Sequence, residues 1–90
     1  MNFRKERLAS LISELLGKEI VRRIETPGVL ITIVNAEVND DLEVVHVYLS
    51  IFPDSKEKEV MKELKKRTPE FQYFLMKKIK IKKIPTLVFK

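Results

Sequence analysis

The stretch VLITIVNAEVNDDLEVVHVYLSIF, residues 29–52, decides the fold of this chain. Two runs rich in β-branched residues flank the short polar segment Asn39-Asp40-Asp41, a pattern typical of an antiparallel hairpin. The first run changes parity after Ile33, which predicts a β-bulge near Val34-Asn35. Alternate residues of the second run form one apolar face that we expect to be buried: Val45, Val47, Leu49 and Ile51.

One amphipathic helix is predicted before the hairpin. Its apolar residues recur at helical spacing and form a single stripe: Leu8, Leu11, Ile12, Leu15, Leu16 and Ile20. The segment Thr26-Pro27-Gly28 should end this helix, because proline cannot continue one and disfavours helical geometry in the residue before it.

Two helices separated by a break are predicted after the hairpin. Asp54-Ser55-Lys56-Glu57 resembles a capping box that opens the first of them. Thr68 has the character of a second N-cap, with Pro69 at the first helical position, where its missing N–H costs nothing. The apolar residues expected to face inward are Val60, Met61 and Leu64 in the first helix and Phe71, Phe74, Leu75 and Ile79 in the second.

The last segment, IKIKKIPTLVF at residues 79–89, alternates like a strand, and Pro85 confines it to a sheet edge. The predicted order is therefore α-β-β-α-α-β. Because the third strand returns after two helices, we expect it to lie parallel to the second by a right-handed connection. These expectations describe a two-layer α+β fold in which the helices cover one face of a three-stranded mixed sheet, with residues 1–90 forming one domain.

Composition places the chain among globular proteins, because 44% of its residues are hydrophobic and 34% are charged. No apolar run approaches the roughly 20 residues that span a bilayer, and the N-terminal segment does not have the pattern of a signal peptide. The sequence contains no cysteine, which excludes disulfides and zinc–thiolate sites. A cytoplasmic location is the resulting expectation.

The charge is unevenly distributed along the chain, whose formal net charge is +5. Residues 1–23 carry six basic and three acidic side chains, residues 24–54 carry six acidic and no Lys or Arg, and residues 55–90 carry twelve basic and four acidic. A charge run often serves only as a solvated face. This separation goes further than solubility requires, and it favours a basic end that faces a polyanion.

No catalytic or metal-binding constellation is visible. His46 is the only histidine, and in a strand beside Tyr48 it is more typical of a surface or packing residue than of a general base. Asp40, Asp41 and Glu43 offer oxygen ligands at the hairpin turn, although turn aspartates more commonly bond their own backbone. The sequence therefore predicts that the protein is not an enzyme and that it binds neither a cofactor nor a metal.

The candidate binding site is the basic run around the helix break, where a helix N-terminus would itself favour phosphate. Tyr73 should point outward among lysines and is a candidate for stacking on a base. The predicted RNA-binding residues are Lys58, Lys62, Lys65, Lys66, Arg67, Thr68, Tyr73, Lys77, Lys78 and Lys80.

The order of elements and the basic helix–bend–helix resemble a type II KH domain, and specifically the ribosome-binding factor A family. Residues 38–42, VNDDL, resemble the family's V-S-x-D-L turn, and residues 47–50 and 84–89 resemble its later strands. In that family an Ala-x-Gly kink replaces the GxxG loop of KH domains; here Arg67-Thr68-Pro69 stands at the kink. Gln72 stands where the family commonly has an arginine.

This resemblance implies a factor that binds the immature small ribosomal subunit and its ribosomal RNA. It would assist late maturation and rRNA processing without catalysis and dissociate before translation. We expect a monomer, and a homodimer through the edge strand is the alternative. An alternative is a protein-interaction domain that docks a basic partner through the acidic hairpin, with lysines serving only solubility. A membrane-surface domain is a third possibility, disfavoured because the lysine faces should lack adjoining exposed apolar residues.

Overall fold

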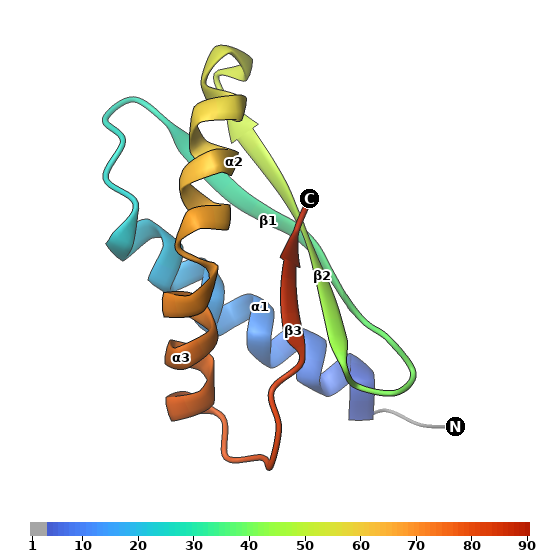
Figure 1. The fold of residues 1–90 in the computed structure, drawn as a ribbon. Coiled ribbons are helices and arrows are strands. Elements are labelled where there is room, and N and C mark those ends of the chain that lie inside the picture. The colour runs from blue at the N-terminus through green and yellow to red at the C-terminus, as the bar shows by residue number, and fades with distance from the viewer. Residues whose placement is uncertain (1–3) are drawn as a thin grey trace.

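The computed structural model describes residues 4–90 and confirms the predicted α+β class (Figure 1). A 3₁₀ turn, η1, precedes the second helix. The elements, in chain order, are α1 (Arg4–Arg23), β1 (Leu30–Val38), β2 (Val44–Phe52), η1 (Asp54–Lys56), α2 (Glu57–Lys66), α3 (Thr68–Lys78) and β3 (Thr86–Phe89).

The sheet has the predicted topology. Its strand order is β1-β2-β3, with β1 antiparallel and β3 parallel to the central β2. The register shifts between Ile33 and Asn35, which confirms the predicted bulge. At the hairpin turn, the side-chain oxygen of Asn39 accepts the backbone N–H groups of Glu43 (2.8 Å) and Val44 (3.0 Å), so a side chain holds the turn in shape.

The connection from α1 to β1 is a tight turn. The helix ends at Arg23, somewhat before the Thr26-Pro27-Gly28 segment that was expected to end it. The N–H of Val29 then donates to the carbonyl oxygen of Thr26 at 3.1 Å. Gly28 takes a φ of +79° in this turn, a value that favours glycine because a Cβ would be strained there.

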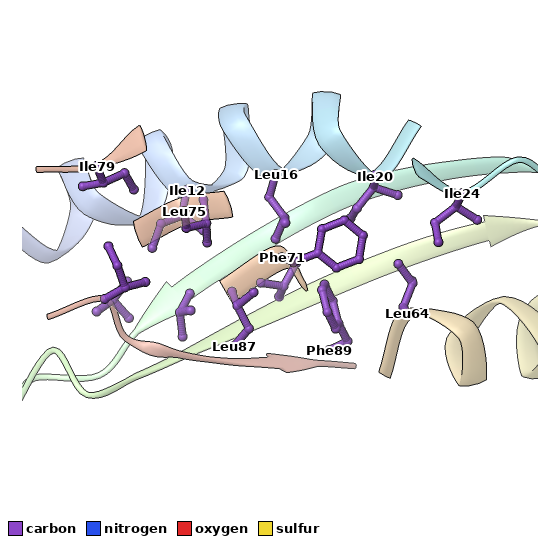
Figure 2. Packing of buried hydrophobic residues seen from close by; sticks show 14 of the residues in the cluster. Ile12, Leu16, Ile20, Ile24, Leu64, Phe71, Leu75, Ile79, Leu87 and Phe89 are labelled. Carbon is purple, nitrogen blue, oxygen red and sulfur yellow. The ribbon is translucent and has the colours of Figure 1, made fainter. Parts of the chain in front are cut away.

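The core lies between the sheet and the helices (Figure 2). Phe71 is fully buried in it, and its ring meets that of Phe89 edge-on, with centroids 5.9 Å apart. Val45, Val47 and Ile51 are buried as predicted.

Six residues expected on the inward apolar faces are less than fully buried: Leu8, Leu11, Leu15, Leu49, Met61 and Phe74. Leu49 and Phe74 are only half-buried, and Leu11 is 41% exposed. β3 ends at Phe89, and the residue beside Leu49 is Lys90, whose carbonyl oxygen accepts the N–H of Leu49 at 3.0 Å. Leu11 lies at the margin of the helical stripe, away from the sheet.

Both predicted N-caps are wrong. A capping residue needs extended backbone, and the extended residue before η1 is Pro53 (φ −77°, ψ 158°), whose side chain has no oxygen to accept a bond. Residues 54–56 instead form the 3₁₀ turn. Thr68 is already the first residue of α3, so its hydroxyl turns back and donates to the carbonyl oxygen of Leu64 at 3.2 Å. Pro69 does lie in the first turn of α3, as predicted.

The predicted strand over residues 79–89 is too long, because β3 begins only at Thr86. The N–H of Ile79 still donates to the carbonyl oxygen of Leu75, so this residue closes α3. The ladder starts where the N–H of Thr86 reaches the carbonyl oxygen of Glu43 at 2.8 Å. Segment 80–85 is therefore a loop between α3 and the sheet edge.

Gln72 fastens α3 to the start of β3. Its amide nitrogen donates to the carbonyl oxygen of Pro85 at 2.6 Å, and its amide oxygen accepts the N–H of Leu87 at 3.0 Å. One side chain thus satisfies a donor and an acceptor of the backbone. Gln72 therefore has a structural role here.

We expect Gln72→Ala to lower the free energy of unfolding by about 1–3 kcal/mol, because two partly buried backbone groups lose their partner. Chemical denaturation measures this loss. Tyr73→Phe is the control. Tyr73 follows Gln72 in the chain and its side chain is exposed, so removing its hydroxyl should change the free energy of unfolding little. Equal stability of the two variants would show that the amide contributes no net stabilisation.

Candidate nucleic-acid interface

The helix break is formed by a single residue, Arg67, between α2 and α3 (Figure 1). Its side chain is half-buried and bonds to neighbouring groups of the protein. The Nε atom of Arg67 lies 2.8 Å from Glu63 Oε1, and Nη1 lies 3.4 Å from the carbonyl oxygen of Arg23. The hydrogen bond from Arg67 holds the pKa of the Glu63 carboxyl below its ordinary value. Arg67 is therefore engaged within the protein, where it holds the bend.

Charged side chains tie the end of α1 to this bend. Glu19 is buried, 4% exposed, and accepts hydrogen bonds from Arg22 Nη2 at 2.9 Å and from Arg23 Nε. Arg23 Nη1 also reaches Glu70 Oε2 in α3 at 3.1 Å. The sequence reasoning missed Glu19, although a glutamate followed by arginines three and four residues later is a signal for such a cluster.

The pKa of Glu19 is lowered, first by the hydrogen bond from Arg22 and further by Arg23, and burial opposes the shift. A lowered folded-state pKa means that ionised Glu19 stabilises the fold above the unfolded pKa, and that this contribution is lost as pH falls through the folded pKa. We expect Glu19→Gln to lower the melting temperature at neutral pH and the difference from wild type to shrink in strong acid.

The matched control for this prediction is Glu14→Gln on the same helix. Glu14 is exposed and lies 3.8 Å from Lys18, a surface pair that contributes little. Thermal melts of all three proteins across pH measure the effect. A Glu19→Gln difference that does not change with pH would mean that packing, not charge, makes Glu19 matter.

The lysines predicted to bind RNA are exposed on α2, α3 and the loop that follows. They are Lys58, Lys62, Lys65 and Lys66 on α2, Lys77 and Lys78 on α3, and Lys80 after it. None of them forms an ion pair with any residue in the range 4–90, in contrast to Arg67. Their charge is therefore free to meet a ligand.

A groove of about 460 Å³ lies between α3 and the loop that leads to β3. Tyr73 and Met76, each 56% exposed, line the α3 side, and Lys82 and Lys83 line the loop side. Lys77 Nζ lies 5.3 Å from the centroid of the Tyr73 ring, a cation–π distance. The prediction that Tyr73 points outward among lysines is confirmed.

The groove adds residues that the sequence reasoning left out. The predicted strand over residues 79–89 includes Lys82 and Lys83, and only the shorter β3 leaves them in the loop that borders the groove. Apolar residues also adjoin the lysines, since Met76 and Ile81 (46%) are exposed, contrary to expectation. Exposed rings and apolar groups beside cations suit unstacked bases with nearby phosphates.

The described residues include no group of three or more His, Asp or Glu side chains that could hold a metal. Nδ1 of His46 is buried without a hydrogen-bond partner, and its ring lies 6.5 Å from that of Tyr48. At the hairpin turn, Asp40 Oδ1 lies 2.6 Å from Lys5 Nζ. Within residues 4–90, no helix is both long and apolar enough to cross a membrane.

Comparison with known protein families identifies the family of this chain. The sequence profile described as ribosome-binding factor A matches residues 4–90. The chain belongs to the ribosome-binding factor A family. Ribosome-binding factor A of Pelodictyon phaeoclathratiforme is 33% identical over 92 aligned residues, covering 99% of this chain and 77% of that protein. The Flavobacterium johnsoniae protein of the same name is 31% identical over 91 residues, covering 96% and 70%.

Solved structures of ribosome-binding factor A have the same fold. The crystal structure of the Thermus thermophilus protein superposes with a TM-score of 0.83 at 23% identity, covering 96% of this chain and 92% of that one. The solution structure of a Thermotoga maritima protein, described as a putative ribosome-binding factor A, gives 0.79 at 27% identity, covering 100% and 90%. The family and fold predicted from sequence are both confirmed.

A third structural relative carries information on a complex. It is a homology model of Thermus thermophilus ribosome-binding factor A fitted into the cryo-EM map of a 30S complex. Its TM-score is 0.76 at 20% identity, with coverage of 90% of this chain and 87% of that one. At that identity the likeness shows a shared ribosome-binding factor A fold.

Proposed function

We propose that this chain is a ribosome-binding factor that binds the immature small ribosomal subunit and its ribosomal RNA. It assists late maturation and rRNA processing and then dissociates. The observation that carries the proposal is a surface of exposed lysines around the helix bend of a ribosome-binding factor A fold, none of them in an ion pair within the described residues 4–90. A relative with this fold, the Thermus thermophilus factor, has been placed in a 30S complex.

The residues divide into two roles. The lysines of α2 and α3 contact phosphates, and Tyr73 stacks on an unpaired base in the groove, with Lys82 and Lys83 neutralising phosphates on its other side. Arg67 and Thr68 hold the bend through Glu63 and the Leu64 carbonyl. The two lysine-bearing helices then meet RNA at a fixed angle.

Binding and release are sufficient for this role, so we propose no catalysed reaction. We further propose that residues 1–90 act as one RNA-binding domain, as a monomer, in the cytoplasm with the small subunit. Docking of a basic partner through the acidic hairpin is the less favoured function. At its tip, Asp40 is already paired with Lys5, which reduces the charge available there.

Co-sedimentation with purified small subunits, immature and mature, across a salt series tests the proposal. If lysines neutralise phosphates, log affinity should fall linearly with log salt, with a slope of about −0.7 to −0.9 per contact. Immature subunits should bind more tightly than mature ones. Binding that does not respond to salt would contradict the phosphate contacts, and equal affinity for both subunits would contradict the maturation role.

A further inference from the structure

The first strand is an edge of the sheet, and it carries a bulge between Ile33 and Asn35. β1 pairs with β2 on one side only and spans nine residues. It contains no lysine, arginine or proline, the residues that commonly shield an edge from further pairing. Leu30 and Val34 on this strand are 65% and 62% exposed. The edge therefore offers both backbone groups and apolar side chains to a partner.

Two hollows run along β1 on the side of α1. One, of about 610 Å³, lies between the N-terminal half of α1 and residues 34–38. The other, of about 450 Å³, lies between the end of α1, the following turn and residues 29–31. In the first, the helix presents Ala9, Ser10 and Ser13, whose small side chains leave room beside the strand.

The charges lining these hollows are mainly negative. The carboxylates are Glu6, Glu25 and Glu37, and the one lining cation in the described chain is Lys5. Lys5 Nζ is already bonded to Asp40 at 2.6 Å. An occupant of this edge would therefore gain from positive charge, and a phosphate backbone would be repelled.

We propose that β1 accepts an extended, lysine- or arginine-bearing polypeptide segment as a fourth strand of the sheet. Backbone hydrogen bonds between β1 and the segment supply affinity. Leu30 and Val34 contact apolar side chains of the segment, and the carboxylates beside β1 select its basic side chains. A second copy of this chain fits poorly, because its own β1 carries no lysine or arginine to pair with these carboxylates. β1 and β3 are opposite edges, so the segment and RNA can bind at the same time.

A blocked nonapeptide of alternating lysine and valine is the probe, added to the isotopically labelled full chain. Amide hydrogen exchange should slow in β1 and remain unchanged in β3. A glutamate–valine peptide should not bind, because its charge is repelled by the carboxylates beside β1. A lysine–proline peptide should not bind either, because it keeps the charge but cannot form a ladder. Equal binding of the proline peptide, or slowed exchange at β3 in place of β1, would overturn the proposal.

Charge reversal on the edge gives the second test. Glu37→Lys should weaken the lysine–valine peptide at least about tenfold, because attraction becomes repulsion beside the bound strand. Glu57→Lys, an equal change at an exposed position in α2, should leave the affinity unchanged. Unchanged melting temperatures would establish that both variants are folded. Equal weakening by both substitutions would show that only the net charge matters and would refute a site at β1.

Discussion

Replacing Lys65, Lys66 and Lys77 together with glutamate should reduce affinity for the small ribosomal subunit at least about a hundredfold, because three phosphate contacts become repulsions. The melting temperature should change little, since all three side chains are exposed and none forms an ion pair with a residue between Arg4 and Lys90. Arg67 is left out of the set because its side chain holds the bend, and reversing it would confuse binding with stability. Co-sedimentation at fixed salt measures the loss.

A control with the same change in charge separates a local site from general attraction. Arg7, Lys18 and Lys90 are exposed and lie outside α2, α3 and the groove. Their reversal to glutamate should weaken binding much less. Equal losses in the two triple variants would show that net charge alone attracts the protein to RNA. Wild-type affinity in the first variant would place the site elsewhere on the molecule.

Phe71→Ala should have the largest effect on folding, a loss of about 3–5 kcal/mol in the free energy of unfolding. Phe71 is fully buried, and Figure 2 shows its ring within the cluster between α1 and β3. Removing it takes away the edge-on contact with Phe89 and leaves a cavity where α3 meets the sheet. Because small domains are typically stable by only about 5–15 kcal/mol, the variant would be close to unfolding.

Denaturant titration measures this loss, and Phe74→Ala on the same helix is the matched control. Phe74 is only half-buried, so removing its ring empties less of the core and should destabilise the protein less. Phe71→Leu should fall between wild type and alanine, because it retains much of the volume. Equal losses from Phe71→Ala and Phe74→Ala would contradict the central position given to Phe71.

The hairpin of β1 and β2 could be predicted because its signals are local. The parity change after Ile33 marks the bulge, and the alternation in β2 identifies Val45 and Val47 as core residues. The helix starts could not be predicted from residue type, because capping depends on which residue is extended. That residue is Pro53 before η1, and Thr68 is already inside α3.

The candidate site was only partly predictable, because it too depends on contacts that residue type alone does not reveal. A run of lysines indicates exposure, and the lysines of α2 and α3 are exposed. Whether a cation is free depends on its neighbours, and Arg67 has Glu63 one helical turn before it. The place of Lys82 and Lys83 depends on where β3 begins, which is set by tertiary contacts of Thr86 and Gln72 rather than by local pattern.

The separation of charge between the two sides of the molecule should also affect how fast the protein associates with its target. β1 and β2 belong to the segment with no lysine or arginine, whereas β3 and the two helices before it belong to the segment with twelve basic residues. In the field of a polyanion such a molecule experiences a torque that turns α2, α3 and their lysines forward before contact. A larger share of collisions then begins in the productive orientation. Its association rate at low salt should exceed that of a protein with the same net charge of +5 spread evenly over its surface.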